Sequence, residues 1–212
     1  MQCTLYNHSF TLVPEAAAYW ENTKSLLIAD AHLGKISHFR KNGFAVPHRI
    51  QFSFYQKIEQ LMDRFDVARI FFLGDLFHSN YNREWDQFSA WVQQSPAQAI
   101  LVKGNHDILP ENHWRQSGME VVPEWREAGF LLTHHPEERE NYFNFCGHIH
   151  PGVQLQGPGR QRLKTPCFFH RPQQMILPAF GDFTGLHLLQ PKAADRVYAL
   201  TEETVLAVRL VS

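Results

Sequence analysis

Hydrophobic residues in the first half of the chain fall into short runs separated by longer amphipathic stretches. The runs at 25–29, 69–73 and 99–102 have the length and composition of buried β-strands. Residues 48–64 and 84–94 instead place apolar side chains three or four positions apart, which is the spacing of an amphipathic helix. Strands that alternate with helices predict an α/β fold with a mainly parallel sheet covered by helices.

The second half has a different pattern, with short apolar runs separated by glycine and proline. This pattern is typical of strands joined by turns, so we expect mostly antiparallel strands in a second sheet packed on the first. The loose alternation over 2–13 predicts an opening hairpin. Without repeats or a linker, residues 1–212 are expected to form a single domain. The later runs lie at 119–122, 129–133, 143–146, 152–156, 167–170, 173–177, 185–189, 195–200 and 204–210.

The composition indicates a globular protein without a membrane segment or a disulfide framework. Hydrophobic residues make up 44% of the chain, which is enough for a sizeable core. No apolar run approaches the roughly 20 residues that cross a bilayer. The start Met1-Gln2-Cys3-Thr4 lacks the basic-then-apolar layout of a secretion signal. The three cysteines are odd in number and widely spaced, so we expect a reducing, cytoplasmic environment.

The charge is unremarkable, whereas the histidine content is unusual. A formal net charge of −1 excludes the global basic field of many nucleic-acid binders. The chain has thirteen histidines, and histidine is the commonest metal ligand among side chains. Several of them belong to five polar clusters, each of which directly follows an apolar run. The clusters are Asp30-Ala31-His32, Gly74-Asp75, Gly104-Asn105-His106-Asp107, Thr133-His134-His135-Pro136 and Gly147-His148-Ile149-His150.

Each cluster also has an ordinary structural interpretation. A single Asp-x-His is usually a turn, His134-His135 before a proline could be a solvated loop, and Asp107 could cap a following helix. The five clusters together favour a common site, because ligand crevices of α/β sheets lie beyond the carboxyl ends of the strands. Imidazole, carboxylate and amide ligands without a thiolate favour manganese, iron or zinc over calcium.

The ordered set from Asp30 to His150 resembles the signature of calcineurin-like metallophosphoesterases. The resemblance implies a four-layer α/β/β/α sandwich of two packed mixed β-sheets, with two divalent metal ions between their carboxyl ends. Manganese is the expected metal, with iron or zinc as alternatives. One ion is expected to bind Asp30, His32, Asp75 and His150, and the other Asp75, Asn105, His134 and His148. His134 is preferred over His135 because it directly follows the apolar strand.

The same resemblance implies catalytic roles. His106 is expected to stay off the metals and to act as general acid toward the leaving group, with Asp107 orienting and stabilising it. Two divalent ions carry about four positive charges, and the two carboxylates neutralise only part of them, so net positive charge remains to bind a phosphate. The metal pair can also activate a water molecule and hold the entering and leaving oxygens. Apart from the resemblance, Arg40, His78 and His135 are expected to contact the substrate, although the loop around Arg40 could equally be an ordinary solvated loop and His78 an ordinary loop histidine. Arg40 lies in a loop with aromatic and basic residues, which suits a nucleic-acid backbone.

A finer resemblance is to the PdeM-type subfamily of small bacterial enzymes. It is carried by Ile28 to Lys35 with Phe39-Arg40, Gly43 to Pro47, Gly74 to Ser79, and Gly147 to Pro151. These enzymes are described as ligase-associated DNA damage response endonucleases, linked with a DNA ligase and a helicase. The resemblance implies cleavage of phosphodiesters in DNA, including single-stranded DNA, or in nucleotides.

Three rival functions stay open at this point. The near-neutral charge is compatible with a small-molecule phosphatase or pyrophosphatase acting on a nucleotide or a lipid-sugar precursor. A phosphoprotein phosphatase would share the same metal chemistry. An inactive binding scaffold is the least favoured rival, because every ligand position is filled. The residues specify neither the cleavage mode (endo or exo) nor the oligomeric state, and a homo-oligomer is compatible with them.

Overall fold

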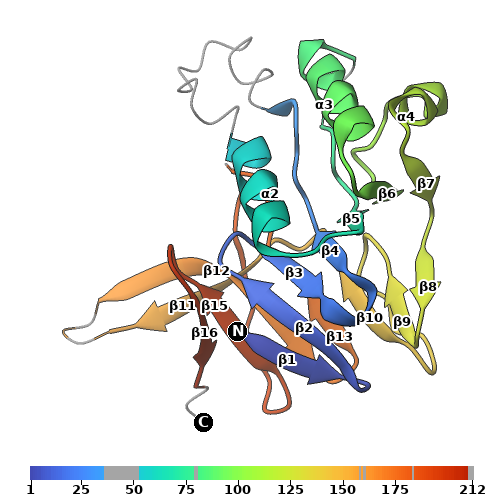
Figure 1. Ribbon diagram of the computed structural model, residues 1–212. Helices are drawn as coiled ribbons and strands as arrows, with labels where there is room; N and C mark the ends of the chain where they lie inside the picture. Colours follow the sequence, from blue (N-terminus) through green and yellow to red (C-terminus); the bar gives the residue numbers. More distant parts are fainter. Residues whose placement is uncertain (36–52, 79–80, 158, 160, 183, 210–212) are drawn as a thin grey trace.

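Two β-sheets packed face to face form the body of the protein, and helices lie against one of them (Figure 1). The structure is a computed structural model and describes residues 1–35, 53–78, 81–157, 159, 161–182 and 184–209. Arg40, predicted to contact the substrate, lies outside the described residues, as does the start of the helix predicted over 48–64. The helices of the described chain are too short or too polar to span a bilayer.

The first sheet has seven strands in the order β1-β2-β3-β4-β5-β6-β7. Pairs from β1 to β4 are antiparallel, and pairs from β4 to β7 are parallel. The predicted opening hairpin and the parallel core are therefore confirmed. The strands are β1 (Gln2–Leu5), β2 (His8–Val13), β3 (Ala17–Trp20), β4 (Ser25–Ile28), β5 (Arg69–Leu73), β6 (Gln98–Val102) and β7 (Glu120–Val122), with a short 3-10 helix, η1 (Glu21–Thr23), before β4.

Within the residues that the structure describes, three helices connect the parallel strands of this sheet. They are α2 (Ser53–Arg64), α3 (Arg83–Gln94) and α4 (Glu111–Ser117). Each crossover steps one strand further in the same direction, so right-handed connections put all three on the same face. Asn82 caps α3 by accepting hydrogen bonds from the N–H groups of Glu84 and Trp85. The helices α2 and α3 confirm the prediction from apolar spacing. Helix α4 was not predicted, because seven residues are too few to show a helical spacing of apolar side chains.

The second sheet contains nine strands, and five of its eight strand pairs within the described residues are antiparallel, so the prediction of a mostly antiparallel half is confirmed, although the sheet is mixed. Strand β10 pairs in parallel with both β9 and β13. The run at 119–122 is also not part of this sheet, because it forms β7 at the edge of the first. The strands are β8 (Trp125–Glu127), β9 (Phe130–Leu132), β10 (Phe143–Cys146), β11 (Pro151–Gln156), β12 (Arg162–Arg171), β13 (Gln174–Ile176), β14 (His187–Leu188), β15 (Arg196–Leu200) and β16 (Val205–Val208).

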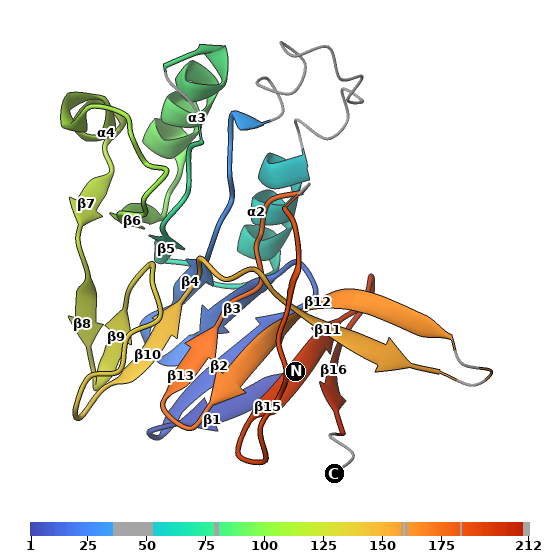
Figure 2. The same ribbon diagram turned by 180° about the vertical axis from the view of Figure 1, so that it is seen from behind.

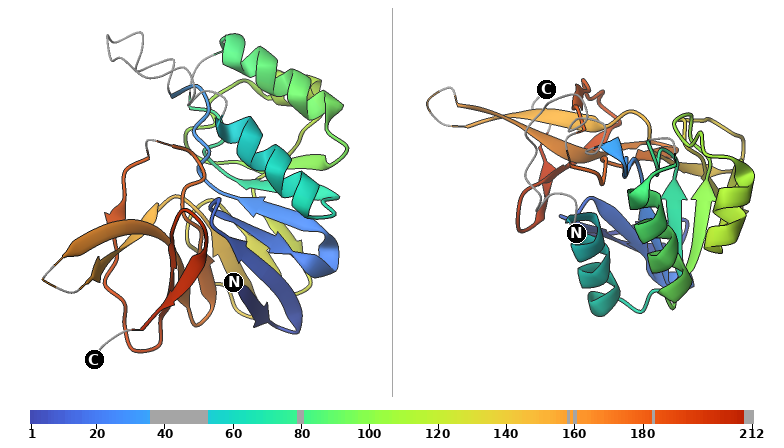
Figure 3. Two further views of the ribbon diagram at one scale, coloured as in Figure 1. Left: turned by 60° about the vertical axis from the view of Figure 1, so that its left-hand side comes forward. Right: turned by 90° about the horizontal axis from the view of Figure 1, so that it is seen from above.

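The two packed mixed sheets and the helices on the first sheet agree with the predicted sandwich, whereas the fourth, helical layer of the predicted α/β/β/α order is not found within the described residues. Seen from behind, the second sheet lies in front of the first (Figure 2). Every described element after Val122 is a strand, so the second sheet carries no helical layer within the described residues. Many of its strands are joined by hairpins, which need no helical crossover. One such hairpin, β11–β12, extends away from the body (Figure 3).

Aromatic side chains from both sheets fill the space between them. Phe130 of the second sheet lies 5.0 Å from Trp20 and 5.3 Å from Phe10 of the first, measured between ring centroids. Phe145 lies 4.9 Å from Phe10. All four are almost fully buried, and burial of each large apolar side chain contributes about 1.5–3 kcal/mol. This shared core fixes how the strand ends of the two sheets face one another.

The two sheets are also joined directly at the edge where the polar clusters begin. Ala29, the residue after β4, forms an isolated parallel bridge with Ala179. The Phe180 N–H donates to the Ala29 carbonyl at 2.9 Å. The carboxyl end of β4 is therefore held against the segment that follows β13, and the site lies at this junction.

Candidate metal centre

Seven predicted metal ligands follow the carboxyl ends of five strands, three from the first sheet and two from the second. The structure brings all seven together at one edge, although they come from segments up to 120 residues apart. They are Asp30 and His32 after β4, Asp75 after β5, Asn105 after β6, His134 after β9, and His148 and His150 after β10.

Most of these ligands hold a backbone conformation that L-residues rarely adopt. Eleven described non-glycine residues have a positive φ, and five of them are predicted ligands, with φ between 47° and 67°. Such conformations cost of order 1–3 kcal/mol each and persist where the surroundings enforce them, often at functional sites. The five are Asp30, His32, Asp75, His148 and His150.

One group of converging side chains consists of Asp30, His32 and His150. The Nε2 atoms of His32 and His150 lie 3.2 Å apart, and His150 Nε2 lies 3.5 Å from Asp30 Oδ1. Asp30 Oδ2 accepts a hydrogen bond from the His148 N–H at 2.8 Å. Asp30 Oδ1 is buried and has no hydrogen-bond partner within the described residues. A buried carboxylate oxygen beside two imidazoles fits a cation as its missing partner.

A second group is centred on His134. Its Nδ1 lies 2.9 Å from the Leu73 carbonyl oxygen. Because that oxygen can only accept a hydrogen bond, Nδ1 carries the proton, and the neutral ring then has its lone pair on Nε2. Nε2 lies 3.0 Å from Asn105 Oδ1, 3.4 Å from Asp75 Oδ1 and 3.2 Å from His148 Nδ1. Several lone pairs therefore point at one small volume, which suits a metal ion.

The electrostatics of the described residues fit this donor set. Burial lowers the pKa of His32 to about 3, so the ring is neutral and able to bind a metal. Burial raises the pKa of Asp75, but the adjacent His134 ring, the hydrogen bond from the His106 N–H and the positive charge that the neighbouring imidazoles can carry outweigh it and hold the pKa well below its usual range. Asp75 is therefore ionised, and it contacts the second group while lying close to Asp30 of the first.

Glycines beside the ligands allow this close approach. A Cβ atom at Gly104 would lie 2.4 Å from the Asp75 nitrogen and 2.5 Å from its Oδ1. A Cβ atom at Gly147 would lie 2.6 Å from Asp30 Oδ2. Gly74 has a φ of +79°, and a Cβ atom there would lie 2.2 Å from His134 Nδ1. The glycine that precedes each of these clusters in the sequence is therefore required by the packing of the site.

Replacement of Gly104 by alanine is expected to damage both the fold and metal binding. The added methyl group must displace the Asp75 backbone, and such overpacking typically costs about 1–3 kcal/mol. Urea denaturation would measure the free energy of unfolding, and calorimetric titration with Mn²⁺ would measure affinity. Gly185→Ala is the matched control, because a Cβ atom there meets nothing within 4 Å. Equal stability and affinity of the two variants would contradict the packing role of Gly104.

His106 lies beside the predicted ligands without joining their groups. Its side chain is 45% exposed, and its Nε2 lies 4.0 Å from Asp75 Oδ2. The ring packs against His78, with centroids 4.1 Å apart and an interplanar angle of 30°. His78 also lies 5.3 Å from the His32 ring. The predicted position of His106 at the open side of the centre is compatible with contact to a substrate, and His78 holds its ring there.

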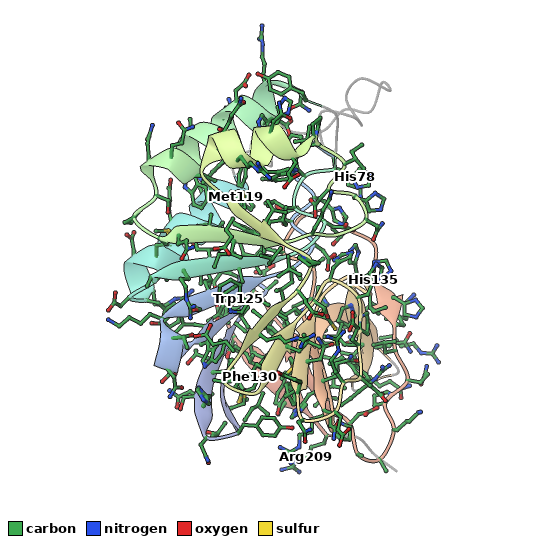
Figure 4. The ribbon with its side chains drawn as sticks, turned by 90° about the vertical axis from the view of Figure 1, so that its right-hand side faces the viewer. His78, Met119, Trp125, Phe130, His135 and Arg209 are labelled. Atoms are coloured by element: carbon green, nitrogen blue, oxygen red, sulfur yellow. The ribbon has the colours of Figure 1, made fainter. Side chains whose placement is uncertain are left out.

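His134 and His135 have distinct environments. His134 is buried at the centre, as described above, whereas His135 is exposed and its ring lies 4.1 Å from that of His148. Figure 4 shows His78 and His135 projecting from the same side of the molecule. A ligating atom of His135 still comes within 4.8 Å of those of His134 and His148. The geometry thus places His135 at the rim of the centre, facing solvent.

Asp107 has a different role from the predicted one beside the His106 ring. Its Oδ1 accepts hydrogen bonds from the N–H groups of Leu76 and Phe77, at 2.9 and 3.1 Å, and its Oδ2 from that of Gly104 at 2.8 Å. It does not cap α4 either, since the N-cap position is Pro110. Burial raises the pKa of Asp107, and these hydrogen bonds oppose that effect. Asp107 therefore ties the loop after β5 to the loop after β6.

Replacement of Asp107 by alanine is expected to lower the free energy of unfolding by about 2–4 kcal/mol, because three backbone N–H groups lose their acceptor. Thermal and urea denaturation would measure the loss. Asp107→Asn keeps one acceptor oxygen and should lie between wild type and alanine. Unchanged stability with reduced turnover would instead support the predicted role next to His106.

The sequence analysis did not identify one residue that shapes the site. Gly181 lies so close to the first cluster that a Cβ atom would come within 2.2 Å of the Ala31 carbonyl oxygen. Gly181-Asp182 follows a short apolar stretch, as Gly74-Asp75 does, so a weak signal was present. Its contact with Ala31 depends on the packing of the two sheets, which local sequence patterns do not encode.

Comparisons with known proteins agree with this arrangement. The sequence profile described as Calcineurin-like phosphoesterase matches residues 23–167. The crystal structure of Pseudomonas putida nuclease MPE is similar at a TM-score of 0.83 and 27% identity, covering 97% of this chain and 99% of that one. A protein of unknown function from Aquifex aeolicus, AQ665, has 19% identity and a TM-score of 0.39, over 64% of this chain and 82% of that one, which is too low to support an argument. No curated protein matches.

The profile covers more than half of the chain and includes the predicted ligands from Asp30 to His150. The similar nuclease spans nearly the whole chain and agrees with the subfamily expected from the motifs. The fold and the donor set fit a hydrolase that cleaves phosphoester bonds with the help of metal ions. The chain belongs to the calcineurin-like phosphoesterase family.

Proposed function

We propose that the protein is a dinuclear-metal phosphodiesterase that cleaves DNA. The observation that carries the proposal is the convergence of imidazole, carboxylate and amide donor atoms around His134 Nε2 and Asp30 Oδ1. Asp30, His32, Asp75 and His150 would hold one ion, and Asp75, Asn105, His134 and His148 the other. When bound, the ions would supply positive charge that binds the phosphate and activates water.

Residues of the chain other than the metal ligands would donate a proton, position other side chains and contact the substrate. His106 would donate a proton to the departing oxygen, since it reaches the open side of the centre from beside Asp75. His78 would keep the His106 ring in place through their stacked contact. His135, exposed at the rim, would contact the substrate. Leu73 would fix the His134 tautomer through its carbonyl.

The choice of DNA is supported by the similar P. putida protein, which is named a nuclease. Single-stranded DNA is the form we expect to be cleaved, with manganese as the metal. The PdeM-type resemblance supports a role in cytoplasmic DNA repair alongside a ligase and a helicase. Arg40 would belong to the substrate-binding surface.

A direct test compares four substrates in the presence of Mn²⁺. They are bis(p-nitrophenyl) phosphate, p-nitrophenyl phosphate, and a labelled oligonucleotide in single-stranded and duplex form. We expect cleavage of the diester and of single-stranded DNA, abolished by a chelator. A strong preference for the monoester with DNA left intact would contradict the proposal and favour a small-molecule phosphatase. Intact DNA and an intact diester, together with hydrolysis of a phosphoserine peptide in a separate assay, would favour a phosphoprotein phosphatase.

A further inference from the structure

A cavity of about 510 Å³ lies between α4 and β7 and opens beside the metal centre. Its lining includes Gly104 and Asn105 from the loop after β6, and His135 from the loop after β9. Asn105 Oδ1 lies 3.0 Å from His134 Nε2, so the cavity begins at a predicted metal ligand. A group attached to a phosphate at the predicted ligands would therefore lie next to the cavity on this side.

The floor of the cavity is apolar and partly aromatic. It is formed by Trp114 of α4, by Val121 and Val122 of β7, and by Pro123. The Trp114 Nε1–H donates to the Leu109 carbonyl at 3.1 Å, so this indole needs no polar partner from the cavity. Such a floor favours the flat, apolar face of a ring over a charged or strongly hydrated group.

The rim of the cavity is polar and carries side chains of positive and negative charge. Lys103 is exposed and has no ion-pair partner within the described part of the chain. Glu111 is exposed, and its carboxylate pairs with Arg115 at 2.8 Å on the surface of α4. His135 lies on the side nearest the predicted ligands His134 and His148. An apolar floor with separate donors and acceptors at its rim matches a planar ring with polar edges.

We propose that this cavity binds the nucleobase of the nucleotide attached to the scissile phosphate. The proposal rests on the phosphodiesterase function and names the part of the substrate that the same site recognises. A nucleobase has apolar faces for Val122 and Pro123, and edge groups that Glu111 or Lys103 can bind by hydrogen bonds. The cavity also falls within the usual range of ligand sites, about 300–1,000 Å³.

Other occupants fit less well. A phosphopeptide would place a flexible, hydrated chain over the apolar floor, with only Lys103 and Glu111 to satisfy its backbone. A lipid chain would leave Lys103, Glu111 and His135 without a role. The nucleobase is the occupant that uses both the floor and the rim.

The test compares two diesters with the same leaving group, thymidine 5′-(p-nitrophenyl) phosphate and methyl p-nitrophenyl phosphate, in the presence of Mn²⁺. Val122→Phe fills the cavity without touching a predicted ligand. Pro123→Phe fills it from an exposed position and serves if the first variant is unstable. Leu206→Phe on the exposed face of β16, remote from α4 and β7 in Figures 1 and 3, is the matched control.

We expect the wild-type KM to be lower for the thymidine ester, and the filling variants to raise that KM about tenfold with little change in kcat. The methyl ester should be hydrolysed equally by all variants. The proposal would be overturned if the filling variants kept full activity toward both esters. It would also be overturned if they lost activity equally toward both. Hydrolysis of neither diester by the wild-type protein would instead overturn the phosphodiesterase function itself.

Equilibrium binding gives a second measurement that needs no turnover. Wild-type protein should bind thymidine 5′-monophosphate about tenfold more tightly than inorganic phosphate, and Val122→Phe should remove that advantage. The control variant should keep it. Equal affinities of the wild-type protein for the two ligands would contradict a nucleobase site, as would a cavity-dependent preference for a phosphoserine peptide.

Discussion

Replacement of Asp75 by asparagine is expected to lower kcat on the order of a thousandfold, because it removes a charge worth several kcal/mol to a metal-dependent reaction. Asp75 is 2% exposed, ionised, and lies 3.4 Å from His134 Nε2 and close to Asp30. It is the residue we assign to both ions. We therefore also expect fewer than two manganese ions per chain, measured by elemental analysis after dialysis.

The matched control for this prediction is Asp66→Asn. Asp66 is an exposed carboxylate that pairs with Lys24 on the surface, and surface pairs contribute little. This variant should keep its activity and its metal content. Two bound ions and full activity in Asp75→Asn would show that the bridging assignment is wrong.

Replacement of His106 by alanine is expected to lower kcat about 10²- to 10⁴-fold on DNA, which is the usual contribution of a general acid. The leaving group of DNA is an alkoxide that needs a proton, whereas p-nitrophenolate leaves without one. The loss should therefore be small with bis(p-nitrophenyl) phosphate. The backbone N–H of residue 106, which donates to Asp75 at 2.9 Å, is retained in the variant.

His78→Ala separates chemistry from positioning in the same experiment. His78 touches the His106 ring but is not assigned a proton transfer, so we expect a smaller loss on DNA with the same dependence on the leaving group. Equal losses of His106→Ala on both substrates would indicate structural damage. Unchanged turnover on DNA would show that His106 is not the acid.

Much of the fold could be predicted from the sequence because its parallel core has local signals. The strand at 69–73 has the predicted limits, and the helix 83–94 begins one residue before the predicted position. The second half was less predictable, since β9, β10 and β13 are only three or four residues long. Such short runs show that a strand exists but not which neighbour it pairs with, so the parallel pairing of β10 was missed.

The site was predictable as a set of residues but not in its supporting contacts. Each cluster stands directly after a strand, so local sequence places Asp30, Asp75 and His134 at strand ends. The partners of Asp107 could not be found in this way, because the N–H groups of Leu76 and Phe77 are about 30 residues away. The left-handed backbone of the ligands was equally hidden, because Asp and His adopt it more often than most residues but still at a minority of positions.

The central claim is that two metal ions share the Asp75 carboxylate at the carboxyl ends of the strands. The most direct measurement is an anomalous difference map from a crystal grown with Mn²⁺. We predict two peaks, one bounded by Asp30, His32 and His150, and the other by Asn105, His134 and His148, with Asp75 touching both. A single peak, or two peaks of which Asp75 contacts only one, would contradict the assignment.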